Sequence, residues 1–288
     1  MIVVTGANGF IGSWMIEKLN AENFNDILAV DEFRNKKPHN YLLDLHFSKM
    51  LHLENLEEWL NQANDQVEFV VHLGAITDTT LEDEALFAKF NTNYTKMLWK
   101  ICAMKQIPFI YASSAATYGN GAYGFKVDYD NIKNLRPLNH YAKSKHSFDI
   151  WALDQIEKPY YWAGLKFFNV YGPKREGHKG KMASMAYQIE EQIKETGKVK
   201  LFKSYKSGIK HGEQKRDFIH VSEVVNEIYN LMQDRSNSGI RNIGSGKAKS
   251  FNELTTEVAK SLNQTLNIEY IDMPQSLREN YQYFTLAE

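Results

Sequence analysis

The sequence contains a single cysteine, Cys102, among its 288 residues. One thiol excludes an intramolecular disulfide and a metal site built from cysteines, and its place in a helix-like segment favours a buried structural role. An excess of one charge is also absent, because 34 basic residues face 35 acidic ones, so nothing favours bulk attraction to nucleic acid. No apolar run reaches the length of a membrane span. The first predicted strand begins at Met1, which leaves no room for a signal peptide, and we expect a cytoplasmic enzyme.

Short apolar runs alternate with longer helix-like segments over the first part of the chain. This alternation predicts right-handed crossovers and a parallel sheet, and the continuous apolar character of the strands indicates that both faces of the sheet are covered. The predicted strands are Met1–Val4, Ile27–Val30, Val67–Leu73, Ile107–Ala112 and Tyr160–Phe168, and the later predicted helices are Leu53–Asn64, Asp83–Met104 and His140–Glu157. The sequence therefore predicts an α/β fold with a Rossmann-type doubly wound parallel sheet.

The composition changes after Phe168, where residues 169–180 hold three glycines and a proline. The elements predicted beyond this point are the helix Met182–Thr196, the strand Val199–Phe202, the helix Ser222–Gln233, the strand Ile240–Ile243 and the helix Phe251–Leu262. We expect a smaller C-terminal α/β substrate lobe over residues 171–288, after an NAD(P)-binding Rossmann domain over residues 1–170. The boundary is soft, because elements of the two parts can interleave.

A glycine-rich turn joins the first predicted strand to a helix-like segment. Gly6, Gly9 and Gly12 have the spacing at which the first glycine permits a tight turn, the second admits a pyrophosphate and the third lets helix and strand pack closely. Asp31 ends the next strand, at the distance expected for an acid that binds an adenosine ribose hydroxyl. The order of strand, turn, helix, strand and acid predicts a dinucleotide site, whereas the glycines alone would also fit a plain βα turn.

Three polar residues form the second feature with chemical meaning. Tyr141 and Lys145 are four residues apart, so they share one face of a helix, and a nearby ammonium favours the phenolate of a tyrosine that serves as a base. Ser114 ends a predicted strand at the sheet edge where ligands bind in open α/β folds. A helix cap is the structural alternative for this serine, but with the pair downstream we expect Ser114, Tyr141 and Lys145 to be catalytic.

Together these motifs resemble the extended short-chain dehydrogenase/reductases that modify nucleotide sugars. Within that superfamily, the segment Phe-Asn-Val-Tyr-Gly-Pro at residues 168–173 and Arg-Glu-Gly-His-Lys-Gly-Lys-Met-Ala-Ser at residues 175–184 closely resemble the bacterial ADP-L-glycero-D-manno-heptose 6-epimerases. Arg-Asp-Phe at residues 216–218 and Tyr-Gln-Tyr-Phe-Thr at residues 281–285 fit the same pattern, so the resemblance runs along the whole chain.

The resemblance implies an isomerase that inverts C6 of ADP-D-glycero-D-manno-heptose and supplies heptose for the lipopolysaccharide core. Because C6 is not acidic, the reaction would pass through a ketone, with a hydride taken up and returned by a tightly held NADP. The ketone must turn over between the two half-reactions, so two acid/base groups suit it better than one. Tyr141 matches the first and Lys179 the second. Relatives of this kind form homo-oligomers, which implies a pentamer.

The resemblance also implies binding residues, position by position. For the cofactor these are Gly6, Gly9, Phe10, Ile11, Gly12, Asp31, Glu32, Leu73, Gly74, Ala75, Ile76, Thr77, Asn91, Tyr141, Lys145, Val170 and Lys179. For the ADP-heptose substrate they are Ser114, Asn169, Lys181, Gln188, Phe202, Lys203, Ser204, Tyr205, Arg216 and Tyr281. Arg216 is physically apt, because a guanidinium can hold a diphosphate with two hydrogen bonds.

Two departures from the family pattern concern the ribose end of the cofactor. Glu32 follows Asp31 where the family has asparagine, and Pro38 replaces a lysine that helps to hold a 2′-phosphate. Arg34, Lys36 and Lys37 are close enough in the sequence to compensate for the repulsion between a carboxylate and a phosphate. We therefore predict NADP, with NAD as the alternative.

Two other functions are compatible with this frame. One is another nucleotide-sugar epimerase or dehydratase of the superfamily, but Ala115, Ala116 and Thr117 offer none of the carboxylates that a dehydratase uses there. The other is a catalytically silent NADP-binding sensor, which would not need the Tyr141–Lys145 pair that this chain retains.

Overall fold

The structure is a computed structural model that describes residues 1–33, 40–63, 66–278 and 281–288, apart from the side chains of residues 178, 181 and 276. The expected compensation by Arg34, Lys36 and Lys37, together with the position of Pro38, lies outside the described residues. The predicted substrate contact of the Lys181 side chain lies outside them as well.

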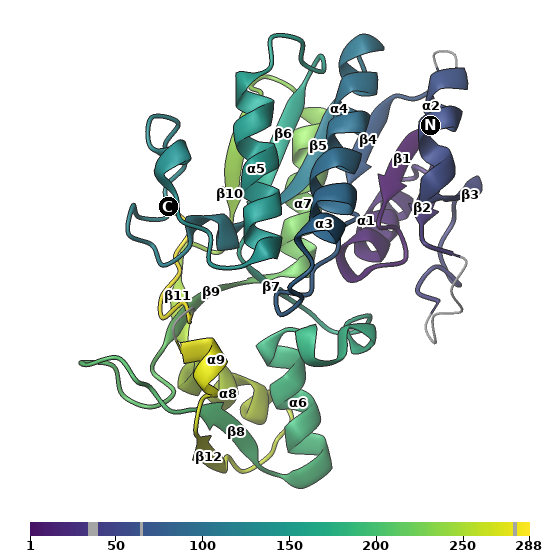
Figure 1. The fold of residues 1–288 in the computed structure, drawn as a ribbon. Helices are drawn as coiled ribbons and strands as arrows, with labels where there is room; N and C mark the ends of the chain where they lie inside the picture. The colour runs from purple at the N-terminus through teal and green to yellow at the C-terminus, as the bar shows by residue number, and fades with distance from the viewer. Residues whose placement is uncertain (34–39, 64–65, 279–280) are drawn as a thin grey trace.

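A seven-stranded parallel sheet forms the centre of the larger lobe (Figure 1). Its strand order is β10-β6-β5-β4-β1-β2-β3, and every neighbouring pair is parallel. The strands are β1 (Ile2–Thr5), β2 (Ile27–Asp31), β3 (Lys49–His52), β4 (Phe69–His72), β5 (Phe109–Ser114), β6 (Trp162–Phe167) and β10 (Gly239–Ile243). The order reverses between β1 and β4, which is where ligands bind in folds of this kind. The predicted fold class is confirmed.

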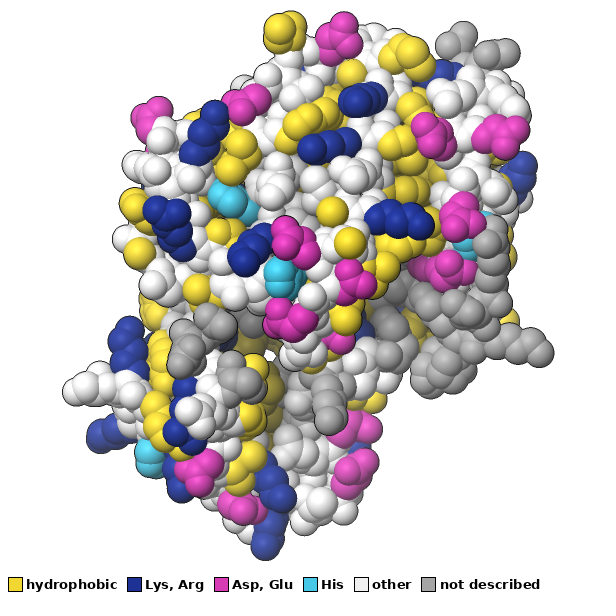
Figure 2. Space-filling model, viewed as in Figure 1, with side chains coloured by type: hydrophobic (Ala, Val, Ile, Leu, Met, Phe, Trp, Pro, Cys, Tyr) yellow, Lys and Arg dark blue, Asp and Glu magenta, His cyan; other side chains and the backbone are white. Residues whose placement is uncertain are grey.

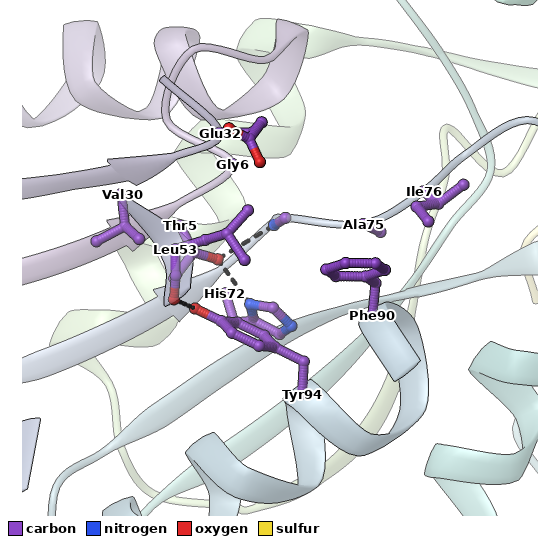
Figure 3. Close-up of a pocket in the computed structure, with 11 residues that line it drawn as sticks. Thr5, Gly6, Val30, Glu32, Leu53, His72, Ala75, Ile76, Phe90 and Tyr94 are labelled. Carbon is purple, nitrogen blue, oxygen red and sulfur yellow. Dashed lines mark hydrogen bonds between the residues drawn. The ribbon is translucent and has the colours of Figure 1, made fainter. Parts of the chain in front are cut away.

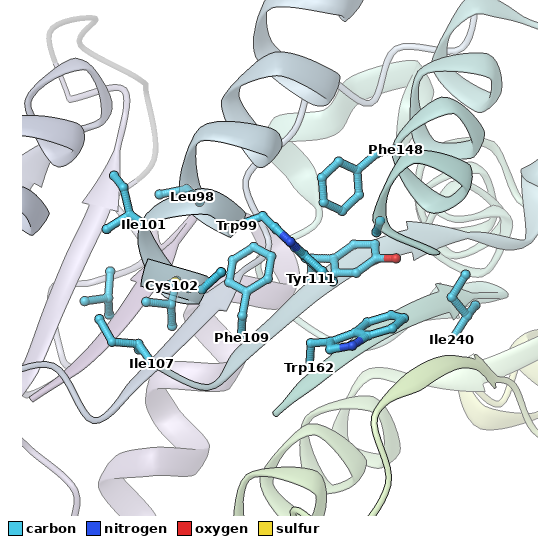
Figure 4. Packing of buried hydrophobic residues seen from close by; sticks show 14 of the residues in the cluster. Leu98, Trp99, Ile101, Cys102, Ile107, Phe109, Tyr111, Phe148, Trp162 and Ile240 are labelled. Atoms are coloured by element: carbon cyan, nitrogen blue, oxygen red, sulfur yellow. The ribbon is translucent and has the colours of Figure 1, made fainter. Parts of the chain in front are cut away.

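Helices cover both faces of this sheet, because successive side chains of each buried strand point to opposite sides. Val3 of β1 belongs to one apolar cluster and Val4 to a second one on the other face. The first cluster also holds Trp99, Phe109 and Phe148, whose packing against the strands is seen in Figure 4. It lies under α2 (Leu56–Gln62), α4 (Tyr94–Met104) and α5 (His140–Asp154), whereas α1 (Phe10–Ala21) and α7 (Val221–Gln233) pack on the other face.

The smaller lobe is built mainly from later segments of the chain. It contains α6 (Met185–Thr196) and α8 (Phe251–Ser261), the parallel pair β8 (Val199–Phe202) and β12 (Ile268–Ile271), and the short helix α9 (Gln275–Arg278). A three-stranded sheet of β7 (Asn169–Tyr171), β9 (Lys215–His220) and β11 (Ala248–Ser250) connects the lobes. Ile189, Val199 and Leu254 are buried in the apolar core of the smaller lobe. Between these segments the chain returns to the larger lobe, since β10 pairs with β6 and α7 packs on α1.

Residues 281–288 tie the two lobes together. Gln282 Nε2 donates to the carbonyl oxygen of Gly119 at 2.5 Å, and Asn242 Nδ2 donates to that of Glu288 at 3.0 Å. On the side of the small lobe, the buried carboxylate of Asp217 accepts from the backbone N–H of Ala287 at 3.0 Å. Asp217 adjoins Arg216, so this segment also helps to fix the predicted substrate-binding arginine. In the described part of the chain, no helix has both the length and the apolar character needed to cross a membrane.

A fully buried histidine joins β1, β4 and α4. The backbone N–H of Gly74 donates to Thr5 Oγ1, which leaves the Thr5 hydroxyl proton for His72 Nδ1 at 2.6 Å. Thr95 gives its proton to the carbonyl of Asn91, so it accepts from His72 Nε2 at 2.9 Å. A neutral His72 therefore carries its proton on Nε2 and accepts from Thr5 at Nδ1. Burial lowers the pKa of His72 to about 3.

The His72 chain predicts a loss of stability in mild acid. The unfolded histidine gains a proton below its ordinary pKa of 6.5, whereas the folded one stays neutral down to a pH of about 3. In that window the free energy of unfolding falls by about 1.4 kcal/mol per pH unit because of this one group. Urea unfolding of His72→Gln at several pH values should show a shallower acid slope than the wild type. The exposed His46, changed to Gln, is the control, and an unchanged slope in His72→Gln would contradict the assignment.

Candidate functional site

The glycine turn is as tight as the sequence predicts. Gly6 has φ +67°, and a Cβ on it would lie 2.6 Å from the backbone nitrogen of Gly74 in the loop after β4. A Cβ on Gly12 would lie 2.0 Å from the carbonyl oxygen of Gly6, so α1 can approach the turn only with glycine there. Among the described residues no side chain caps the N-terminus of α1, which begins at Phe10 after the N-cap Gly9. The turn therefore presents backbone N–H groups and a helix N-terminus, which together suit a pyrophosphate.

An apolar pocket of about 250 Å³ opens beside this turn (Figure 3). Val30 and Leu53 lie on one side of it, and Ile76 and Phe90 lie on the other. The complete lining consists of Thr5, Gly6, Val30, Glu32, Leu53, His72, Gly74, Ala75, Ile76, Phe90 and Tyr94. A pocket of this shape and polarity suits a flat base such as adenine.

Two acids follow one another where β2 ends, and the second of them, Glu32, lines the pocket. The Asp31 carboxylate accepts from the backbone N–H groups of Asn8 at 2.9 Å and of Glu32 at 2.7 Å. The Glu32 carboxylate lies 2.7 Å from His52 Nε2. Because the N–H of Glu54 donates to His52 Nδ1, a neutral His52 carries its proton on Nε2 and donates it to Glu32. Asp31 and Glu32 are thus held in place by Asn8 and His52, and a role in binding a ribose stays a prediction.

Asn91 joins the pocket loop to α5. Its Oδ1 accepts from the N–H of Ile76 at 2.9 Å, while its Nδ2 donates to the carbonyl of Ile76 at 2.9 Å and to Ser144 Oγ at 3.1 Å. The predicted helix over residues 83–104 is interrupted here, because α3 (Glu84–Phe87) is followed by a π-helical stretch (Ala88–Asn93) before α4. Such stretches often occur at functional sites. The predicted cofactor residues Leu73, Gly74, Ala75, Ile76, Thr77 and Asn91 therefore lie on segments that this side chain connects.

Ser114, Tyr141 and Lys145 lie together at the carboxyl end of β5. Asn139 caps α5 by accepting from the N–H of Ala142 at 2.8 Å, so the helix begins directly before Tyr141. Lys145 Nζ donates to the carbonyl oxygen of Ala112 at 2.8 Å, and burial lowers the pKa of Lys145 to about 8. Ser114 is the N-cap of a short 3-10 turn over Ala115–Tyr118, and its Oγ accepts from Ala116 N at 3.1 Å.

The pKa of Tyr141 shows how burial and hydrogen bonding compete. Burial raises the pKa of Tyr141, because a charged phenolate loses hydration, and the hydrogen bond with Ser114 acts in the opposite direction. The sequence-based expectation that Lys145 lowers this pKa is not met in the structure, where burial outweighs the other effects. The physical reason is that Tyr141 and Lys145 are both buried, while the ammonium is directed at the Ala112 carbonyl.

Lys179 lies against the start of α1. Its Nζ is 4.7 Å from the centre of the Phe10 ring, and burial lowers the pKa of this half-buried ammonium. The loop that carries it is closed by Glu176, a fully buried carboxylate that accepts from Gly172 N at 3.1 Å and from Ser184 N at 2.7 Å. Lys179 is therefore positioned beside the predicted cofactor turn. Ile11 on α1 and Val170 on β7 are partly buried in the apolar cluster next to it.

The predicted substrate residues fall into separate groups on the small lobe. Arg216 is 7% exposed, its guanidinium donates to the carbonyls of Lys215 and Gln282, and it lies 5.3 Å from the centre of the Tyr281 ring. No ion pair joins Arg216 to a carboxylate within the residues that the structure describes. Phe202 ends β8 and Lys203, Ser204 and Tyr205 follow it, and the side chains of Lys203 and Tyr205 bind Asp272. Gln188 on α6 binds the carbonyl of Ala183, and Asn169 is exposed at the start of β7.

The surface between the lobes is indented, with the small lobe set off from the large one (Figure 2). On the face shown, Lys and Arg side chains are interspersed with Asp and Glu rather than gathered into one patch. No single basic patch therefore dominates the face shown in Figure 2.

Several residues that shape the site have no recognisable sequence motif. His52 binds Glu32 at the pocket, His72 binds Thr5 directly before the glycine turn, and Asp149 and Lys166 are buried behind Ser114. One signal was available for the last two, because Lys166 stands inside an apolar strand and Asp149 lies two helical turns after Tyr141. A charge inside an apolar run requires a buried partner.

Comparison with known proteins gives consistent results at the level of sequence and fold. The sequence profile described as the NAD dependent epimerase/dehydratase family matches residues 2–244. A protein of Fusobacterium nucleatum named ADP-L-glycero-D-manno-heptose-6-epimerase is 46% identical, over 100% of this chain and 90% of its own length. The crystal structure of the Helicobacter pylori protein of that name has a TM-score of 0.78 and 30% identity, covering 94% of this chain and 84% of the other.

A more distant structure shares the fold. The UDP-glucose 4-epimerase of Thermus thermophilus, solved in complex with NAD, has a TM-score of 0.78 and 23% identity, and the match covers 100% of this chain and 90% of that one. The resemblance that the motifs indicate is confirmed by the profile and by the relatives of higher identity.

The buried Glu176 carboxylate gives a testable prediction for the Lys179 loop. In Glu176→Gln an amide N–H₂ group must face backbone N–H donors, which costs about 1–3 kcal/mol locally. Hydrogen exchange should therefore speed up over residues 172–184, while exchange in β1 and β4 stays as in the wild type. The exposed Glu195 on α6, changed to Gln, serves as the matched control. Unchanged exchange in the loop would show that the carboxylate does not close it.

Proposed function

The chain belongs to the NAD-dependent epimerase/dehydratase family, and from this membership we propose that it inverts C6 of ADP-D-glycero-D-manno-heptose. The product is ADP-L-glycero-D-manno-heptose, a heptose donor for the lipopolysaccharide core. The observation that carries this proposal is the meeting of Ser114, Tyr141 and Lys145 at the carboxyl edge of the sheet, beside a glycine turn that admits a dinucleotide. The names of the relatives at 46% and 30% identity support the choice of substrate.

The described residues fit a nicotinamide dinucleotide. Gly6, Gly9 and Gly12 leave room for its pyrophosphate, the pocket beside Ile76 and Phe90 suits its adenine, and Asp31 suits a ribose. Such a cofactor supplies a reversible hydride acceptor, which an inversion at a non-acidic carbon requires.

The residues of the chain would then handle protons and charge. The deprotonated form of Tyr141, which burial disfavours and the hydrogen bond with Ser114 favours, would accept the proton of the C6 hydroxyl. Ser114 would also stabilise the charge on the oxygen during this transfer. Lys145 provides a buried positive charge next to Tyr141. After the ketone has turned over, its oxygen faces a second group, and Lys179 is proposed for this role because its pKa is lowered and it lies at the cofactor turn.

Arg216 is proposed to hold the diphosphate of the substrate. Its guanidinium is buried without a carboxylate partner among the described residues, so an anionic ligand would supply the missing charge. Tyr281, whose ring lies beside the guanidinium, is placed to cover the same group.

The alternatives are disfavoured by particular features. The turn after Ser114 contains Ala115, Ala116 and Thr117, so it lacks the carboxylates of a dehydratase. A silent sensor would not need a tyrosine and a lysine buried beside Ser114.

The identity of the dinucleotide depends on the ribose end. The resemblance predicts NADP, whereas Glu32 at the pocket, bound to His52, supports NAD because a carboxylate repels a 2′-phosphate. Identification of the nucleotide that denatured protein releases decides between them. The cytoplasmic location and the homo-oligomer, a pentamer by resemblance, stay predictions, and sedimentation analysis tests the second.

Substitution of Tyr141 tests the proposed chemistry. Tyr141→Phe removes the proton acceptor but keeps the buried ring, so turnover of ADP-D-glycero-D-manno-heptose, followed by NMR, should fall by about a hundred- to ten-thousand-fold. Tyr160→Phe, at a side chain that is 64% exposed, is the control. In D₂O the product should carry no solvent deuterium at C6, because the hydride returns to the carbon it left. Solvent deuterium at C6, or an active Tyr141→Phe, would refute the mechanism.

Substitution of Glu32 tests the ribose end. Glu32→Gln keeps a hydrogen-bonding partner for His52 and removes one negative charge, so binding of NADP relative to NAD should rise by about tenfold, whichever the wild type prefers. Calorimetric titration of both nucleotides gives the ratio. The control is Glu54→Gln, which removes a carboxylate 3.8 Å from the other nitrogen of His52 but outside the pocket lining. An equal rise in both variants would point to a general charge effect instead.

A further inference from the structure

Two opposite charges are fully buried between α5 and β6, behind the proposed catalytic residues. Asp149 and Lys166 are both 0% exposed, and Lys166 Nζ lies 2.7 Å from Asp149 Oδ2. The carboxylate also accepts from Ser113 Oγ at 2.7 Å and from Tyr111 Oη at 3.1 Å. A buried ion pair is weak evidence for stability, because desolvation offsets most of the attraction, and its best-attested use is to specify a geometry.

Lys166 also reaches the turn that carries Ser114. Its Nζ donates to Thr117 Oγ1 at 2.6 Å, and Thr117 donates its own proton to the carbonyl oxygen of Ser114 at 2.7 Å. The ammonium lies 5.1 Å from the centre of the Tyr118 ring, which completes its surroundings with a cation–π contact. Because Thr117 has only one hydroxyl proton, the direction of this chain is fixed from Lys166 through Thr117 to the Ser114 backbone.

A glycine on β6 makes room for the network. A Cβ on Gly164 would lie 2.2 Å from Tyr111 Oη, so glycine is required for Tyr111 to reach Asp149. The space is therefore adapted to this hydrogen bond and not to apolar packing alone.

The same network fastens the catalytic face of α5 to β5. Tyr141, Lys145 and Asp149 follow one another at intervals of four residues and so lie along one side of the helix. Lys145 is attached to β5 through the carbonyl of Ala112, and Asp149 is attached one turn further on through Ser113. The helix α5 is therefore attached to β5 at two points, through Lys145 and through Asp149. Lys166, the partner of Asp149, holds the end of β5 that carries Ser114.

We propose that the buried Asp149–Lys166 pair positions Ser114 against the face of α5 that carries Tyr141 and Lys145. The pair also places the Asp149 carboxylate, which the Lys166 ammonium balances, one helical turn from Lys145. This inference rests on the proposed function, because it assigns meaning to the placement of those three residues. Asp149 and Lys166 touch none of the reacting atoms, so they are positioning residues.

The charges around Lys145 determine what the pair does to it. Its own helix carries Tyr141 and Asp149, β4 carries the neutral His72, β5 carries Tyr111, and β6 carries Lys166. Asp149 raises the pKa of Lys145 against the larger lowering by burial, and at Tyr141 it adds to the raising of the pKa by burial. Removal of the carboxylate should lower both pKa values, and removal of the Lys166 cation should raise both.

The pH dependence of turnover tests this electrostatic part. Both limbs of the kcat profile should move to lower pH in Asp149→Asn and to higher pH in Lys166→Met, by on the order of one unit. A structural role alone would lower activity without moving the limbs in opposite directions. If both variants fold and the two limbs of their kcat profiles lie at the same pH as in the wild type, the proposal is overturned.

Thr117 tests the positioning part without removing a buried charge. Thr117→Val is nearly isosteric and breaks the link from Lys166 to the Ser114 carbonyl, so kcat should fall by at least about tenfold. Thr117→Ser keeps the hydroxyl and should restore most of kcat. If Thr117→Val lowers the melting temperature but keeps the wild-type kcat, the pair has only a structural role. These two variants decide the matter if the charge variants do not fold.

A measurement without substrate separates this inference from the proposed function. The phenolate absorbance of Tyr141, defined as the signal that Tyr141→Phe lacks, can be titrated in each variant. Opposite shifts in Asp149→Asn and Lys166→Met would support the pair as a tuning device even if the wild type does not convert ADP-heptose. Identical titrations in wild type and both variants would overturn the inference even if the epimerase activity is found.

Discussion

The direct contact between the backbones of Gly6 and Gly74 is the constraint from which the rest of the site is built. It brings the loop after β1 against the loop after β4, at the point where the strand order reverses. The second loop is bound through Ile76 to Asn91, and Asn91 is bound to Ser144 on α5. One close approach of two glycines is thus transmitted to the helix that carries Tyr141 and Lys145. Any side chain at Gly6 would separate the loops and misplace both the cofactor turn and the proposed acid/base groups.

Three buried polar groups organise this region, and each of the three has hydrogen-bond partners. His72 is neutral and uses both ring nitrogens, Glu176 accepts backbone protons that close the Lys179 loop, and Asp149 is paired with Lys166. A buried polar group without partners would cost several kcal/mol, so complete satisfaction restricts each side chain to one arrangement. Arg216 differs from these groups, because its guanidinium has only carbonyl and ring contacts in the described part of the chain. It is the group that we propose to bind the diphosphate of the substrate.

The sequence predicted the central strands and longer helices because their apolar runs are continuous or periodic. It did not predict β3, β7, β9, β11 and β12. The strand β9 is six residues long and begins with three charged residues, which hide its apolar character, and the other four are three or four residues long and mostly half-buried or exposed. Strands of this kind are stabilised by hydrogen bonds to a partner strand rather than by an apolar pattern, so they have no local signal. The return of β10 to the large sheet likewise depends on pairing between strands, for which the sequence has no local signal. Its five residues read as a strand, but only the pairing with β6 shows to which sheet they belong.

For the site, the sequence by itself determined the features that depend on neighbours along the chain: the glycine turn before α1, the acid after β2, and the four-residue spacing of Tyr141 and Lys145. These follow from backbone geometry and helical periodicity, which act over a few residues. Tertiary structure decided which groups share a buried environment. It placed Lys179 against Phe10, joined Asp149 to Lys166 and made burial the dominant influence on the pKa of Tyr141. Solvation and Coulomb interactions depend on distance in space, and the folded chain alone sets those distances.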